Sequence, residues 1–135
     1  MADVVLVIAQ NNFQDKELMD TKESIQSKGF RCHIAAKTVE TAKGKFGLEL
    51  SPDITLQDAL LGLDMYKSIV FIGGPGAVDY FEDKEALGLA KMSNDKNKIT
   101  AAICIAPMIL AKAGLLDGKK ATVWDENKEQ SKYFQ

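Results

Sequence analysis

Cysteine and histidine are scarce in this sequence: its 135 residues include two cysteines, Cys32 and Cys104, and a single histidine, His33. Two cysteines cannot form a disulfide framework, and a metal site built from Cys and His would have only these three ligands. We therefore expect free, reduced thiols in a cytoplasmic protein, with no metal and no cofactor.

Long hydrophobic runs and an excess of charge of one sign are missing as well. The longest apolar runs, residues 4–9 and 101–106, fall far short of the roughly 20 residues that a membrane span needs, and no basic segment precedes the first of them. The 17 Lys and Arg against 19 Asp and Glu give a formal charge of -2, with no basic stripe and no interleaved aromatic side chains. We therefore expect neither a membrane nor a nucleic acid as a partner.

What is present suits one globular domain that spans residues 1–135. Hydrophobic residues make up 46% of the sequence and charged residues 27%. A chain of this length buries about two-thirds of the surface that its unfolded form exposes, which is enough for one core but not for two.

Short apolar runs alternate with amphipathic segments along the chain, which is the pattern of strands alternating with helices. The predicted strands are residues 4–9, 30–36, 68–72, 99–103 and 121–124. The predicted helices are residues 15–27, 55–61, a segment from the glycine-rich stretch 73–76 to about residue 93, 106–113, and a last one from residue 126, while 43–50 form a hairpin or an irregular excursion. This alternation predicts an α/β fold in which a doubly wound parallel sheet lies between helices, a three-layer α/β/α sandwich.

Three loops at the carboxyl ends of the predicted strands have unusual sequences. Glu17 opens the helix after the first strand, residues 73–76 follow the third strand, and Cys104 follows the fourth. Ligands of open α/β sheets bind beyond such strand ends. If the strand order is the flavodoxin-like 2-1-3-4-5, the first, third and fourth strands are neighbours and the three loops converge.

Cys104 stands between a strand and a helix with no loop between them, in the string AAICIAP. A residue in that position occupies a sharp, strained turn, as the nucleophile elbow of a hydrolase does, and the small alanines beside it allow close packing. The start of the following helix is expected to lower the pKa of the thiol. The alternative is a buried structural cysteine, because free cysteines are among the most buried residues.

Two further features become candidates for a catalytic role if they lie near Cys104. The backbone N–H groups of residues 73–76 and of Ile105 are candidates for an oxyanion hole, the alternative for the glycines being a tight turn. Glu17 is either a surface charge favoured by the helix dipole or, if it points at Cys104, a protonated carboxyl that donates a hydrogen bond to sulfur, since an ionised carboxylate would oppose a thiolate. Such a pair titrates as one unit and leaves the thiol nucleophilic or oxidisable.

The remaining candidate residues have less support for a catalytic role. His33 lies in the middle of a predicted strand, away from the carboxyl edge, and Cys32 beside it is assigned to packing. Trp124 and Tyr133, near the end of the chain, either line the cleft or belong to the core.

The strings FQDKEL, FIGGPGA and AAICIAPMILAKAGLLDGKKAT, in this order and spacing, resemble the ThiJ/PfpI superfamily, also called DJ-1/PfpI. The resemblance covers the whole chain and is closest over residues 99–124. It implies a class I glutamine amidotransferase-like, flavodoxin-like fold and a homodimer or larger oligomer. It also implies roles for four residues: Glu17 matches the family's acidic partner, Cys104 its elbow cysteine, and Gly74 with Ile105 its oxyanion-hole donors.

Two departures from the family pattern narrow these expectations. Members that resemble the PfpI proteases carry His directly after the cysteine, where this chain has Ile105, so an intracellular peptidase or amidase is the least favoured activity. Members also continue past the position where this chain stops at Gln135. We therefore expect that the family's C-terminal segment is missing or is supplied by another chain, which would leave a sheet edge bare and prone to aggregation.

The branch without that histidine resembles glyoxalases, deglycases, redox sensors and thiol-dependent chaperones. We therefore expect a cysteine-dependent enzyme that acts on small reactive carbonyl compounds. Cys104 would attack the carbonyl carbon, Glu17 would move protons, and the N–H groups of Gly74 and Ile105 would stabilise the oxyanion. The alternative is a redox-sensing or chaperone-like protein of the stress response that uses the same oxidisable cysteine.

Overall fold

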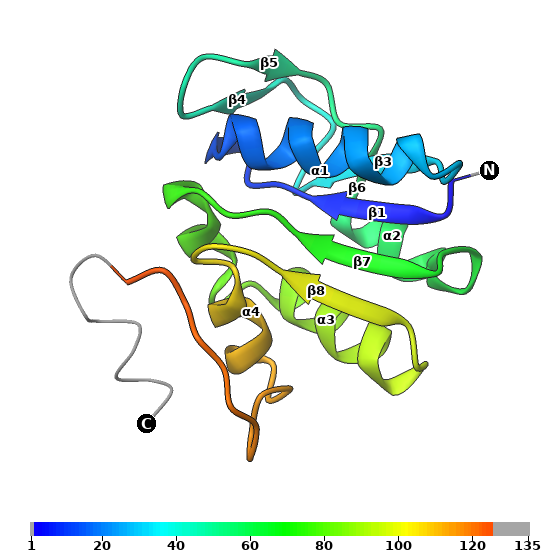
Figure 1. Cartoon of the computed structure of the whole chain (residues 1–135), viewed down its shortest axis with the longest axis vertical. Helices are drawn as coiled ribbons and strands as arrows, with labels where there is room; N and C mark the ends of the chain where they lie inside the picture. Colours follow the sequence, from blue (N-terminus) through cyan, green and yellow to red (C-terminus); the bar gives the residue numbers. More distant parts are fainter. Residues whose placement is uncertain (1, 126–135) are drawn as a thin grey trace.

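A parallel sheet of five strands forms the centre of the chain in the computed structural model, which describes residues 2–125. The strands are, in spatial order, β6 (Ile54–Thr55), β3 (Cys32–Ala36), β1 (Val4–Val7), β7 (Ser68–Phe71) and β8 (Ile99–Ala102). Each strand runs parallel to its neighbours. The first, third and fourth predicted strands therefore lie side by side as β1, β7 and β8, and their carboxyl ends share one edge of the sheet (Figure 1).

Helices cover both faces of this sheet, so the predicted α/β sandwich is confirmed (Figure 1). One face carries α1 (Asp15–Ser27), whose bounds agree with the predicted helix 15–27. The opposite face carries α2 (Leu56–Leu61), α3 (Lys84–Asp95) and α4 (Pro107–Lys112). Two short 3-10 helices, η1 (Leu63–Met65) and η2 (Pro75–Tyr80), follow α2 and β7.

Two apolar clusters fill the space between the layers. Successive side chains of a strand point to opposite faces of the sheet, and β1 therefore contributes to both clusters. Leu6 packs with Leu18 in the cluster beneath α1, whereas Val5 and Val7 pack with Leu89 in the cluster beneath α2, α3 and α4. Burial on both faces explains why the run of residues 4–9 is continuously apolar.

Side-chain caps fix where the helices begin. The side chain of Gln14 caps α1. Thr55 and Asp58 form a reciprocal capping box at the start of α2, and Asp83 accepts the N–H of Ala86 at the start of α3. Each cap satisfies backbone N–H groups that the first turn of a helix leaves without partners.

A second, smaller sheet lies beside α1. It consists of β2 (Asn11–Phe13), β4 (Ala42–Gly44) and β5 (Glu49–Leu50), and β4 and β5 form the hairpin that the sequence predicted. The carboxylate of Asp15 accepts the N–H groups of Phe46 and Leu48 at 3.0 and 2.8 Å, which ties the hairpin to the first turn of α1.

Two predicted elements are wrong. The helix expected from residues 73–76 to about residue 93 is two helices, η2 and α3, because Asp83 caps a new start at Lys84. Residues 121–124 form no strand. The N–H of Trp124 bonds to the carbonyl of Cys104, beyond the end of β8, so this segment meets the loop after the strand and not the strand itself. The helix expected from residue 126, and Tyr133, lie outside the described residues.

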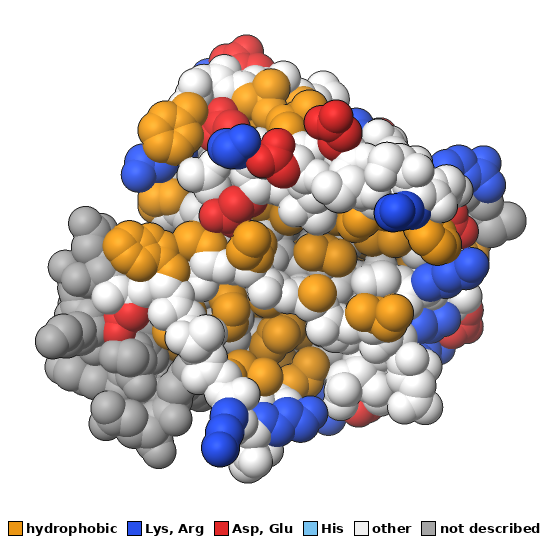
Figure 2. Space-filling view, viewed as in Figure 1, with side chains coloured by type: hydrophobic (Ala, Val, Ile, Leu, Met, Phe, Trp, Pro, Cys, Tyr) orange, Lys and Arg blue, Asp and Glu red, His pale blue; other side chains and the backbone are white. Residues whose placement is uncertain are grey.

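The outer edge of the sheet at β8 carries exposed apolar side chains. Ile99 is 69% exposed and Ile103, just past the end of the strand, is 43% exposed. Figure 2 shows hydrophobic side chains gathered across this face of the molecule, below α1.

Among residues 2–125, no helix is both long enough and apolar enough to cross a bilayer.

Candidate active site

Cys104 occupies a sharp turn between β8 and α4. Its φ of 65° lies in the left-handed region, where a non-glycine residue costs roughly 1–2 kcal/mol. Hydrogen bonds on both sides hold the turn: the N–H of Ile103 donates to Phe71 O at 3.2 Å, and the N–H of Ala106 donates to Ile103 O at 3.0 Å. The thiol is half-buried at this elbow.

Glu17 reaches the same place from the other side of the sheet. It lies half-buried in the first turn of α1, and its Oε1 accepts the backbone N–H of Gly73 at 3.0 Å. A Cβ added to Gly73 would lie 2.6 Å from Cys104 Cβ and 2.8 Å from Glu17 Oε1. Gly73 therefore lies between the carboxyl and the thiol, and the three loops that the sequence singled out do converge.

The glycines after β7 allow the loop after β1 to approach closely. Gly74 has a φ of 110°, and a side chain there would collide with the backbone of Asn12, Phe13 and Gln14. The N–H of Gln14 donates to Gly73 O at 2.9 Å. The two loops are thus packed backbone against backbone, which holds the start of α1, and with it Glu17, against the end of β7.

Burial raises the pKa of the Cys104 thiol, and the charge of Glu17 raises it further. The amide groups of Ile105 and Gly74 act on the sulfur in the opposite direction, and the hydrogen bond with Glu17 adds to the increase. The expectation that the helix start lowers this pKa is therefore wrong. Helix α4 has only six residues, and its contribution is outweighed by burial and by the carboxylate.

This balance favours the protonated form of the Cys104 thiol. With an ionised carboxylate beside it, the sulfur keeps its proton at neutral pH. In the site as it stands the thiol is therefore protonated, and a thiolate would be stabilised by the two amide groups and opposed by the charge of Glu17.

The other candidate residues lie elsewhere or contribute differently. The Nδ1 of His33 is 2.9 Å from the hydroxyl of Tyr66, with which its ring packs edge to face, and the structure does not bring it to Cys104. Cys32 packs against the apolar cluster beneath α1, and burial raises the pKa of its thiol. Trp124 contacts the elbow through its backbone N–H, 2.8 Å from Cys104 O. No sequence signal pointed to that backbone contact.

Metal ligands do not cluster in the part of the chain that the structure describes: no three His, Cys, Asp or Glu side chains there are placed to hold an ion. The chemistry that residues 2–125 present at the elbow is that of a thiol, a carboxyl and two backbone amides.

Comparisons with known proteins identify the family of this chain. The family model described as "DJ-1/PfpI family" matches residues 3–133. An uncharacterized protein of Methanocaldococcus jannaschii is 36% identical over 124 residues, which cover 91% of this chain and 60% of that protein. A protein of Pyrococcus horikoshii named as a deglycase is 29% identical over 118 residues, which cover 87% of this chain and 70% of that protein.

The fold has solved counterparts. The crystal structure of a ThiJ/PfpI domain protein from Brachyspira murdochii superposes with a TM-score of 0.88 at 26% identity, over 97% of this chain and 75% of that one. The present chain therefore spans a part of the length of each of these relatives, down to 60% for the protein of M. jannaschii.

Proposed function

This chain belongs to the DJ-1/PfpI family, and on that premise we propose that it is a cysteine-dependent enzyme that acts on small reactive carbonyl compounds, as a glyoxalase or deglycase does. Relatives named as deglycases support a small-molecule substrate of this kind. Cys104 is the nucleophile, Glu17 is the proton carrier, and the N–H groups of Gly74 and Ile105 form the oxyanion hole.

The observation that carries the proposal is the placement of Glu17 beside the strained thiol. The N–H of Gly73 fixes Oε1 of the carboxyl at 3.0 Å, and the charge and hydrogen bonding of that carboxyl act directly on the Cys104 sulfur. A structural cysteine needs neither a positive φ nor a half-buried acid beside it. Both features suit a nucleophile that exchanges its proton with a neighbouring base.

The first step of the proposed reaction is addition of the thiol to an aldehyde. As the proton of Cys104 moves to Glu17, the sulfur forms a bond to the carbonyl carbon and the C=O electron pair moves to oxygen. The N–H groups of Gly74 and Ile105, which already face the sulfur, stabilise the resulting oxyanion. Glu17 then returns the proton to that oxygen, which gives a hemithioacetal and regenerates the carboxylate.

A 2-oxoaldehyde such as methylglyoxal allows the reaction to continue without an oxidant. Glu17 takes the proton from the carbon that bears sulfur and delivers it to the oxygen of the neighbouring carbonyl, which accepts the electron pair, so that an enediol forms. Glu17 then takes the proton from the hydroxyl group on the carbon that bears sulfur and gives it to the neighbouring carbon, which produces a thioester. Water then cleaves the C–S bond, which releases a hydroxy acid, lactate in this case, and restores the thiol.

Lactate formation from methylglyoxal tests this proposal. The Cys104→Ser variant is expected to lose at least about 100-fold in rate, as is Glu17→Gln, since loss of a positioned proton carrier costs roughly 100-fold or more. Cys32→Ser is the matched control, because Cys32 lies in β3 and packs beneath α1, and it should keep the activity. Equal lactate production by the wild type and by Cys104→Ser would overturn the proposal.

A redox-sensing or chaperone-like role is the alternative that uses the same thiol. Its half-buried position leaves the sulfur open to a small oxidant. Intact-mass measurement after mild peroxide treatment separates the two roles. Addition of two oxygen atoms at Cys104, together with no turnover of methylglyoxal, would favour the sensor over the enzyme.

A peptidase or amidase finds less support in the site. Ile105 follows the cysteine, and the imidazole of His33 is engaged with Tyr66. A Cys-His pair is therefore not available among residues 2–125, since His33 is the one histidine of the chain.

We also propose that the protein forms a homo-oligomer. The apolar surface at the β8 edge, with Ile99 69% exposed, supports this, because water-exposed apolar surface beside an unpaired strand favours association. Light scattering on the purified protein measures the oligomeric state directly.

A further inference from the structure

A small cavity of about 260 Å³, which we call the Tyr80 cavity, opens beyond the carboxyl ends of β1 and β3. It is lined by Gln10, Lys37, Thr38, Glu40, Asp79, Tyr80 and Asp83. The last three come from η2 and the cap of α3, on the side of the sheet opposite α1. None of the residues that surround the Cys104 thiol lines it, although it lies at the same edge of the sheet, where α/β proteins bind ligands.

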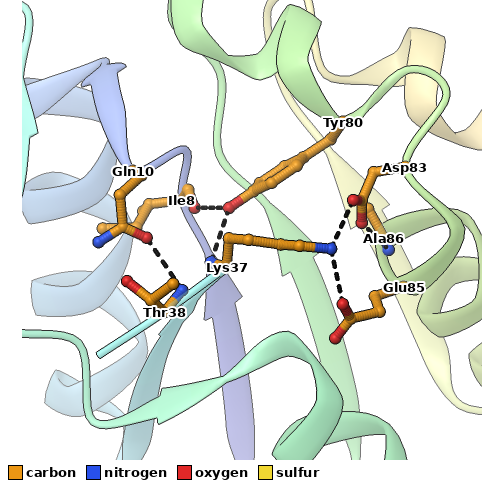
Figure 3. Close-up of polar contacts among 8 residues, drawn as sticks. All are labelled: Ile8, Gln10, Lys37, Thr38, Tyr80, Asp83, Glu85 and Ala86. Atoms are coloured by element: carbon orange, nitrogen blue, oxygen red, sulfur yellow. Dashed lines mark hydrogen bonds and ion pairs between the residues drawn. The ribbon is translucent and has the colours of Figure 1, made fainter. Parts of the chain in front are cut away.

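The cavity has a fixed wall. Tyr80 is 4% exposed, its hydroxyl donates to Ile8 O at 2.8 Å, and it accepts the N–H of Lys37 at 3.1 Å (Figure 3). Burial raises the pKa of this phenol far above its ordinary value, so it stays a neutral donor. Tyr80 therefore ties η2 to the ends of β1 and β3 and keeps the cavity in shape.

The positive charge in the wall is already compensated. The ammonium group of Lys37 lies 2.6 Å from Asp83 Oδ1 and 2.6 Å from Glu85 Oε1, in the arrangement that Figure 3 shows. The hydrogen bonds that the ammonium donates to these two carboxylates raise the pKa of Lys37, so the ammonium persists. Because two carboxylates share one ammonium, Lys37 does not offer a free charge to an anion.

Gln10 is held by the opposite wall. Its side-chain oxygen accepts the N–H of Thr38 at 3.0 Å, and its Nε2 donates to Glu40 O at 2.6 Å. These two hydrogen bonds orient the carboxamide of Gln10 before any ligand binds. Its amide nitrogen has two hydrogens, and the bond to Glu40 O uses one of them.

Two carboxylates remain without partners. Within the described part of the chain, the side chains of Glu40 and Asp79 make no hydrogen bond and no ion pair, and both residues are exposed. The lining residues thus carry one positive and three negative charges. The lining therefore has a hydrogen-bonded frame and two carboxylates that have no partner among the described residues.

We propose that the Tyr80 cavity binds a small guanidinium compound, of the size of a free arginine. A guanidinium has five N–H donors in a planar fork, which suits two carboxylates that come from different segments, Glu40 after β3 and Asp79 in η2. It is also more weakly hydrated than an ammonium. The volume is below that of sites for drug-sized ligands, which are roughly 300–1,000 Å³, so the ligand is small. The site is separate from the proposed catalytic thiol and does not depend on its function.

Titration of the full chain with arginine, followed by amide chemical shifts, tests the site. Arginine is expected to shift the signals of Gln10, Thr38 and Tyr80 saturably. Citrulline has nearly the same shape with a neutral urea group, and it should bind at least about tenfold more weakly, because it lacks the charge that the carboxylates select. Equal shifts with both compounds, or no saturable shift with arginine, would overturn the proposal.

Substitution of the two free carboxylates locates the binding. Glu40→Gln and Asp79→Asn remove charge without breaking a side-chain hydrogen bond among residues 2–125, so the fold should be kept, and each is expected to weaken arginine binding up to about fivefold. Glu23→Gln makes the same charge change on the exposed face of α1 and should leave the affinity unchanged. Unchanged affinity in both cavity variants contradicts the site, as does displacement of arginine by calcium chloride at matched ionic strength, which would identify a metal site instead.

Discussion

The backbone N–H of Trp124 donates a hydrogen bond to the carbonyl of Cys104 across 2.8 Å. Nineteen residues of chain, 105–123, lie between the two and include α4, so this bond closes a loop onto the elbow. It also places the one tryptophan of the sequence next to the residue that we propose as the nucleophile.

Alkylation of Cys104 is therefore expected to change the fluorescence of Trp124. A new group on sulfur crowds the elbow and shifts the carbonyl that Trp124 contacts. The change should follow the same time course as the mass increase measured on the intact protein. The Cys104→Ser variant, treated with the same iodoacetamide, should show a constant signal; a signal that changes equally in that variant would place the tryptophan response elsewhere.

Removing the charge of Glu17 is expected to lower the pKa of the Cys104 thiol. The carboxylate opposes the thiolate through its charge and its hydrogen bond, and both raise the pKa. In Glu17→Gln, the rate of Cys104 alkylation should therefore reach half its maximum at a lower pH than in the wild type. The measurement is made in a Cys32→Ser background, which removes the second thiol, and Glu23→Gln should keep the wild-type midpoint. A midpoint that stays in place or rises would show that the carboxyl does not face the sulfur.

The same pKa shift predicts how stability depends on pH. The folded state holds the Cys104 proton more tightly than the unfolded chain, whose thiol has a pKa near its ordinary 9.0. The resulting stabilisation is complete below that pKa and is lost as the pH rises through the higher pKa of the folded state. Urea unfolding should show the wild type losing stability between neutral and alkaline pH more steeply than Cys104→Ser. Parallel curves for the two proteins would mean that this thiol has the same pKa in both states.

Replacement of Gly74 by alanine is expected to cost more stability than the same change at Gly47. Both glycines have a positive φ, 110° and 100°, which an alanine adopts only at a cost of roughly 1–3 kcal/mol. Gly74 also has a ψ of 159°, a combination that is open almost only to glycine. Gly47 faces open space, whereas a Cβ on Gly74 collides with the backbone of the loop after β1. Urea unfolding of the two variants should therefore show the larger loss of stability for Gly74→Ala, and equal losses would argue against the tight packing of these two loops.

Ile99→Lys is expected to reduce self-association. The substitution places a charge on an edge strand, Ile99–Ala102, that has no charged residue, and charges on edge strands are how natural sheets protect their edges. Leu61→Lys is the matched control, because Leu61 is 80% exposed but belongs to α2 on another surface. Light scattering should show a smaller particle for the first variant alone; a similar decrease in both would point to a general effect of charge.

The order and type of the main elements followed from local signals in the sequence. The polar segment before Gly29 gave α1 its bounds, and the apolar runs gave the four longer strands of the sheet. The convergence of Glu17, Gly73 and Cys104 followed from topology, because parallel strands that are neighbours bring their carboxyl ends together. These inferences needed no knowledge of side-chain packing.

The features that sequence did not predict depend on contacts between distant residues. The direction of the Cys104 pKa reflects burial and a carboxylate 87 positions away in the chain. The Tyr80 cavity is framed by hydrogen bonds from Tyr80 to Ile8 and to Lys37, 72 and 43 residues away. Periodicity and motif spacing carry no information on such pairs, and β6, with two residues, is too short to leave a pattern of its own.

The spacing between Glu17 and Cys104 depends on the absence of a side chain at Gly73. Gly73 has only a hydrogen where other residues have a carbon, and a carbon there would lie 2.6 Å from Cys104 Cβ. Even the smallest side chain at this position, that of alanine, would force the carboxyl of Glu17 and the thiol of Cys104 apart. Larger side chains are excluded for the same reason. A change of substrate therefore has to begin with residues at the rim of the site. Gly73, at its centre, tolerates no other residue although it contributes no side chain.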